Sequence, residues 1–220
     1  MNRWIAGIVA GVLSLALLAP TPTEACVQIV EFTKKDAVWT VARSERMLIR
    51  GDAVGAYRAS RRARHEFERS VREEGPSRQT ESLIARARRI TAVSVVRLDG
   101  WTPITRRDAR RTIVRGREVR SLAWAAGQLR TYAEENPSDL RARSFLGEAL
   151  ARIPAHHEEA REILLSLADR DLMPDAHGYA ALLRVVAMGT TPWNDALTRC
   201  EQMAAENASR ICPSSSSPRS

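Results

Sequence analysis

Apolar residues recur at helical spacing along most of this chain, and short polar stretches with glycine or proline separate the recurrences. This pattern is typical of amphipathic helices that each turn one face to a core. The predicted helices run from Asp36 to the Gly51-Asp52 break, from there to Gly75-Pro76, from Ser77 to Asp99-Gly100, and over 116–135, 139–152, 156–169, 175–189 and 192–208. The sequence therefore predicts an all-α fold, with Asp36 as the N-cap of the first helix.

One segment allows a strand as the alternative. Residues 91–96 (TAVSVV) are rich in β-branched side chains, which favour strands. The residues before them repeat with a helical period, and no neighbouring segment offers a hairpin partner. We therefore predict that this segment is helical.

Residues 137–174 contain two apolar patterns of helical period placed back to back. Pro154 stands in the join and Pro174 at the end. Neither helix could bury its apolar face alone, so each needs its mate and a neighbouring pair. We expect the chain from 36 to 212 to be a stack of about four such helix pairs.

The spacing within 137–174 resembles the tetratricopeptide repeat, a unit of about 34 residues with two antiparallel helices. Leu146, Gly147 and Leu150 match its first helix, while Ala160 and Leu164 match its second. Small residues are needed where the two helices cross at close range. In other units the matching residues are Gly51, Ala56, Ala63 and Ala196.

The resemblance extends over residues 36–208. It implies a tetratricopeptide-like α-solenoid, with a curved surface that binds proteins or peptides and has no chemistry of its own. Another stack of helical hairpins and an unrelated bundle are the alternatives for the fold.

The first 25 residues have the layout of a secretory signal peptide. Arg3 supplies the positive start, residues 4–19 are apolar, and small residues precede the expected cleavage before Cys26. We therefore expect a periplasmic or secreted protein. Residues 26–35 are a short lead, and 213–220 (PSSSSPRS) are expected to be a disordered tail.

Cys26 at the expected new terminus raises a second interpretation. A lipidated Cys26 would anchor the protein in the outer membrane, although Thr23 and Glu24 match a lipoprotein signal poorly. We expect membrane binding only in that case. Export and a short separation predict a disulfide between Cys200 and Cys212, and a bond from Cys26 to one of them is the rival.

Composition changes the picture mainly through charge. The chain has 44% hydrophobic and 27% charged residues, a formal net charge of +8, and lysine only at Lys34 and Lys35. Arginine in such excess usually follows a GC-rich genome, so the charge alone does not indicate nucleic-acid binding. No nucleic-acid-reading motif is present either, and no nucleic-acid partner is expected.

The stretch 99–116 is longer than a typical connection and is not required by the repeat. It is dense in arginines that could hold an acidic peptide, a lipid headgroup or an anionic polymer. A solvated loop with partly paired charges is the plainer interpretation. The candidate residues in and just after this insertion are Arg106, Arg107, Arg110, Arg111, Arg115 and Arg117.

Motifs for catalysis, metals and cofactors are missing from the sequence. His156 and His157 are adjacent, so on a helix their side chains diverge by about 100° and cannot comfortably share an ion. There is no HExxH, CxxC, GxSxG or glycine-rich phosphate loop. The sequence therefore predicts a non-enzymatic scaffold that binds a protein or peptide, without cofactor or metal. Binding of an anionic polymer or membrane surface through the Arg-rich insertion is the alternative.

Overall fold

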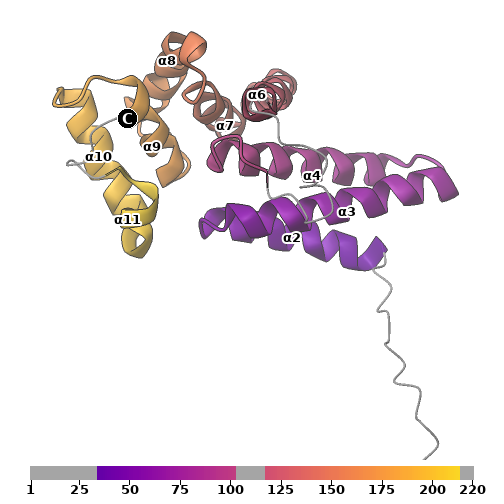
Figure 1. The fold of residues 1–220 in the computed structure, drawn as a ribbon. Helices are drawn as coiled ribbons and strands as arrows, with labels where there is room; N and C mark the ends of the chain where they lie inside the picture. The colour runs from indigo at the N-terminus through magenta and orange to yellow at the C-terminus, as the bar shows by residue number, and fades with distance from the viewer. Residues whose placement is uncertain (1–33, 103–116, 214–220) are drawn as a thin grey trace, which may run out of the picture. The chain divides into compact units, whose positions relative to one another are not determined.

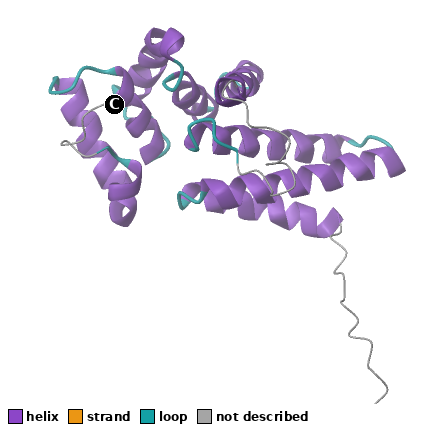
Figure 2. Cartoon of the chain, viewed as in Figure 1, coloured by secondary structure: helices purple, strands orange, loops and turns teal. Residues whose placement is uncertain are grey.

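The computed structural model describes residues 34–102 and 117–213, with side chains described from residue 121 onward in the second range. These residues form helices and contain no strand (Figures 1 and 2). The α-helices are α2 (Lys34–Ile49), α3 (Ala53–Glu74), α4 (Arg78–Arg97), α6 (Arg117–Glu135), α7 (Leu140–Leu150), α8 (His157–Ala168), α9 (Ala176–Val185), α10 (Thr191–Ala204) and the short α11 (Ala208–Ile211). Two 3-10 turns, η1 (Pro154–His156) and η2 (Ala205–Asn207), precede α8 and α11. The predicted all-α fold class is confirmed.

Local chemistry accounts for the boundaries of the first long helices. Asp52 accepts a hydrogen bond from the amide of Gly55 at 2.8 Å, which satisfies a free donor at the start of α3. Gly51 follows α2 closely with φ 78°, and Gly75 ends α3 with φ 87°. Glycine adopts positive φ without steric cost, so it is the residue that both turns favour.

Each long helix packs against the next one along the chain, from α2 through α10. Contacts also skip one helix: α2 packs on α4, α4 on α7, and α7 on α9. Figure 1 shows α2, α3 and α4 lying side by side. The apolar faces of these helices join in one cluster, whose largest fully buried side chains include Phe67, Ile90, Leu129, Leu150, Leu164, Leu167, Leu182 and Leu183.

Helices α7 and α8 approach closely at Gly147. A Cβ atom at this position would lie 2.6 Å from Cδ2 of Leu164 and 3.4 Å from Cγ2 of Ile163. A larger residue would therefore push the two helices apart, because packed cores have few voids. The other residues that the repeat pattern singles out inside helices are buried too: Ala56, Ala63, Leu146, Leu150, Ala160 and Ala196.

Several predicted boundaries are corrected. Helix α2 begins at Lys34, so Asp36 lies in its first turn and is not the N-cap, and the helix includes the last two residues of the predicted lead. An acidic residue in the first turn still favours the helix through the macrodipole. The last predicted helix stops at Ala204, because Ala205 has φ 46° and leaves the helical region. Residues 91–96 are helical within α4, as predicted.

Candidate functional site

A groove of about 460 Å³ lies among α2, α4, the end of α6, the start of α7 and the segment before α9. We call it the α2–α4–α7 groove. Its lining combines apolar, aromatic and charged side chains: Glu45, Leu48, Ile49, Arg86, Arg89, Ile90, Val93, Arg97, Tyr132, Asp139, Arg141, Phe145, Pro174 and Asp175.

The floor of the groove is apolar. Leu48, Ile90 and Val93 are buried there, and Phe145 is half-buried. Ile49, the last residue of α2, is 71% exposed at the same groove. Covering apolar surface stabilises a complex by about 25 cal/mol per Å², so packing on Ile49 and Phe145 would favour binding of a partner.

One wall of the groove is an ion-paired cluster between α2 and α4. Nε of Arg86 donates to Oε1 of Glu45 at 2.6 Å, and its Nη2 makes a second bond to the same carboxylate. Nη2 of Arg89 lies 3.6 Å from Oε1 of Glu45. Burial by itself raises the pKa of Glu45, but the bonds and charges of the two arginines outweigh it and lower the pKa. Glu45 therefore stays ionised at neutral pH.

Another part of the lining comes from α6 and the start of α7, and it adjoins the cluster through Arg89. The guanidinium of Arg89 lies over the ring of Tyr132, with 4.4 Å from Cζ to the ring centre. The hydroxyl of Tyr132 donates to Oδ2 of Asp139 at 2.5 Å, and Oδ1 of Asp139 accepts from the amide of Arg141 at 2.9 Å. Asp139 thus caps α7. The Arg141 side chain is exposed and has no ion-pair partner among the described residues.

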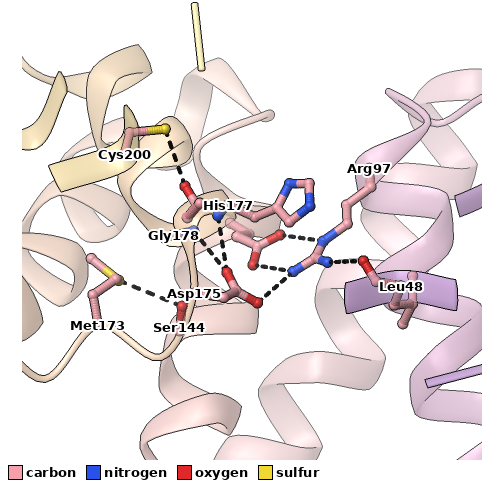
Figure 3. Close-up of polar contacts among 10 residues, drawn as sticks. Leu48, Arg97, Ser144, Met173, Asp175, His177, Gly178 and Cys200 are labelled. Carbon is pink, nitrogen blue, oxygen red and sulfur yellow. Dashed lines mark hydrogen bonds and ion pairs between the residues drawn. The ribbon is translucent and has the colours of Figure 1, made fainter. Parts of the chain in front are cut away.

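A buried charge network lies at the inner end of the groove (Figure 3). Arg97 donates to both carboxylate oxygens of Glu148, at 3.1 Å from Nε and 2.9 Å from Nη2. Its Nη2 also donates to Oδ2 of Asp175 at 3.1 Å, and its Nη1 donates to the carbonyl of Leu48 at 3.1 Å. The side chains of Arg97 and Glu148 are each only 4% exposed. One guanidinium therefore ties together α2, α4, α7 and the start of α9.

Burial and charge shift the pKa values in this network. Burial by itself lowers the pKa of Arg97, but attraction to Glu148 and Asp175 outweighs it, and the net shift is upward. Burial raises the pKa of Glu148 to about 7, against the opposing pull of Arg97. His177 follows the Asp175 cap of α9, and burial together with Arg97 lowers its pKa to about 4. His177 is therefore neutral at pH 7.

This network was not predicted from the sequence. Its one local signal is that Arg97 falls on the same helix face as Ile90 and Val93, which are buried at spacings of seven and four residues before it. A charge within an apolar stripe needs buried partners, because an unpaired charge in a core is strongly unfavourable. The partners themselves cannot be read from the pattern, since Glu148 and Asp175 lie far along the chain.

The predicted disulfide is present in the structure. Cys200 and Cys212 form a disulfide with an S–S distance of 2.07 Å, as predicted. Cys26, the lipidation candidate, lies outside the described residues. His156 and His157 stand at the start of α8, where the sequence placed them.

The Arg-rich candidate site lies almost wholly outside the described part of the chain. Arg106, Arg107, Arg110, Arg111 and Arg115 belong to the range 103–116, and of Arg117 only the backbone is described, as the first residue of α6. The structure therefore does not test the prediction that these arginines bind an anionic partner.

No family model, no curated protein and no solved structure matches the chain. The described residues form an all-helical protein in which each long helix packs on the next. Within the described ranges there is no cluster of His, Cys, Asp and Glu that could hold a metal ion. None of the helices described is long and apolar enough to cross a membrane.

Proposed function

We propose that this chain is a helical-repeat scaffold of the bacterial envelope that binds a protein or peptide segment in the α2–α4–α7 groove. Support for a repeat comes from the contacts that skip one helix, α2 to α4, α4 to α7 and α7 to α9. In a stack of helix pairs the first helices of successive pairs neighbour one another in this way. Envelope location rests on the signal-peptide pattern of residues 1–25.

The observation that carries the proposal is that an exposed apolar side chain and an aromatic one line the same groove. Ile49 is 71% exposed, and Phe145 is half-buried in the same groove. Binding grooves for peptides commonly combine an apolar floor with a few polar groups that fix orientation. Here four arginines face three carboxylates along the lining, so the walls are nearly neutral and favour an occupant with apolar side chains.

Another depression fits a partner less well. It has a volume of about 790 Å³ and lies among α8, α9 and α10. Its exposed side chains are polar apart from Pro192, and they include Asp169, Asp195 and Arg199. It lacks an exposed apolar anchor, and apolar or aromatic anchors dominate protein interfaces.

The test is selection of peptides from a displayed random library against the full chain, followed by affinity measurement on variants. Ile49→Asp places a charge in the groove at a largely exposed position, so the fold should be retained. Met188→Asp is the matched control, because Met188 is also exposed, at 53%, but does not line the groove. We expect the selected peptides to lose about tenfold or more in affinity for Ile49→Asp and to bind Met188→Asp like the parent.

Salt separates this proposal from the sequence-based alternative. Binding in an apolar groove should change little between about 50 and 500 mM NaCl, whereas binding through the Arg-rich insertion should weaken steeply. Equal affinity of Ile49→Asp and the parent would refute the groove as the site. A steep loss of affinity with salt would favour the insertion instead.

A further inference from the structure

A second, smaller cavity lies where Arg97 meets the C-terminal segment, and the peptide proposal does not use it. Its volume is about 120 Å³. A cavity of about 150 Å³ can admit a six-carbon ring, so this one has room for a compact group of five heavy atoms. The polar side chains that line it are Arg50, Arg97, His177, Asn207 and Arg210.

Among the residues that the structure describes, the lining of this cavity is cationic and includes no carboxylate. The charge of Arg97 is balanced by Glu148 and Asp175. Arg50 and Arg210 are exposed, and neither forms an ion pair with any residue of the described ranges. By contrast, the surface arginines Arg86, Arg130 and Arg161 pair with glutamates. Two unbalanced guanidinium groups at one small cavity favour an anion there.

Buried donors also remain unused at the same place. A guanidinium has five N–H groups, and four hydrogen bonds of Arg97 use Nε, both hydrogens of Nη2 and one of Nη1. The second N–H of Nη1 has no partner among the described residues. Nε2 of His177 is buried and has no hydrogen-bond partner among the described residues. An unpaired buried polar atom is costly unless something fills the site. Figure 3 shows the imidazole of His177 beside the Arg97 side chain.

The disulfide holds the outer wall of this cavity. Asn207 ends η2 and Arg210 lies in α11, the short helix directly before Cys212. The bond from Cys212 to Cys200 joins that segment to α10, and α11 contacts both α9 and α10. Without the bond, a four-residue helix and a 3-10 turn would be held only by few contacts. The oxidised form therefore keeps Arg210 and Asn207 at the cavity.

We propose that this cavity binds a tetrahedral oxyanion, a phosphate or sulfate group, between Arg50, Arg97 and Arg210, with His177 and Asn207 as further donors. The neutral imidazole can carry its proton on Nε2 and donate it to the anion. Arg50 and Arg210 are exposed, so the cavity is open to solvent at these side chains. The group can therefore be a free ion or the end of a phosphomonoester.

The test is titration of the full oxidised chain with inorganic phosphate, sulfate and glycerol 3-phosphate, at ionic strength matched with sodium chloride. Arg50→Gln and Arg210→Gln remove donors at exposed positions, so folding should be unaffected. Arg58→Gln is the matched control, because Arg58 is an exposed arginine of α3 outside the cavity. We expect each cavity variant to lose about tenfold or more in affinity and Arg58→Gln to change less than about twofold.

A second readout is specific to the cavity. Bound phosphate should raise the pKa of His177 measured by NMR, because an adjacent negative charge favours the imidazolium. Reduction of the disulfide should weaken phosphate binding in the parent chain. Tighter binding of glycerol 3-phosphate than of phosphate assigns the site to monoesters, and the reverse assigns it to the free ion. The proposal is overturned if Arg50→Gln, Arg210→Gln and Arg58→Gln all bind phosphate with equal affinity. It is also overturned if phosphate leaves the pKa of His177 unchanged.

Discussion

Replacement of Arg97 by methionine should destabilise the fold strongly, because it leaves a buried carboxylate without its counter-charge. Arg97 makes two hydrogen bonds to Glu148, one to Asp175 and one to the carbonyl of Leu48. Asp175 keeps some access to solvent, with 34% of its side chain exposed, whereas Glu148 retains 4%. Most of the lost stability therefore comes from the unpaired carboxylate of Glu148.

The magnitude follows from the behaviour of buried ion pairs. Removing one partner of such a pair costs about 3–5 kcal/mol, whereas replacing both by apolar residues of similar volume is often near neutral. Arg97→Met should thus lower the free energy of unfolding by about 3–5 kcal/mol. The double variant with Arg97→Met and Glu148→Met should recover most of that loss, so the two changes are far from additive.

The pH dependence gives an independent check of the same reasoning. Without Arg97, the pKa of Glu148 in the folded chain rises further, while in the unfolded chain it stays near its ordinary value of 4.5. Between these two values the folded state binds a proton that the unfolded state does not, so stability falls as pH rises. The cost of Arg97→Met should therefore be larger at about pH 8 than at about pH 5.

Urea unfolding followed by circular dichroism, at both pH values, measures the loss in the single variant, the recovery in the double variant and the pH dependence of the loss. The idea that Arg97 neutralises a buried charge fails if the single variant loses less than about 1 kcal/mol. It also fails if the double variant is as unstable as the sum of its parts, or if the loss does not depend on pH.

Two further predictions concern packing and covalent structure. Gly147→Ala should destabilise the fold, because its Cβ would lie 2.6 Å from Leu164. The control Gly127→Ala in α6 meets nothing within 4 Å and should stabilise the fold by about 1 kcal/mol. Thermal melts compare the two variants, and similar effects on stability would show that Gly147 does not lie at a tight helix crossing. Replacing Cys200 and Cys212 together by serine removes the disulfide and should lower the free energy of unfolding by about 2–4 kcal/mol, measured by urea unfolding. Thiol labelling of the denatured, unreduced parent should find both cysteines blocked. Full labelling of both cysteines would contradict the bond.

Local patterns along the chain were enough to predict the helices. The apolar period marks each helix, and the glycine and proline breaks mark its ends to within a few residues. Gly147 and the small residues of the repeat pattern could also be identified, because close helix crossings need small side chains. The disulfide followed from two cysteines only 12 positions apart in a chain with a signal-peptide pattern. The error at Asp36 arose because a possible cap also suits the first turn of a helix that begins earlier.

The groove, the charge network and the cavity needed the tertiary structure. Arg97 reaches Glu148 across 51 positions and Asp175 across 78. A periodic pattern shows which face of a helix is buried, but it does not show which distant helix covers that face. Burial also sets the pKa values of Glu148 and His177, and burial is a property of the packed helices. Helix formation depends on neighbours within a turn or two, whereas pairing of buried charges and shaping of cavities depend on which helices meet.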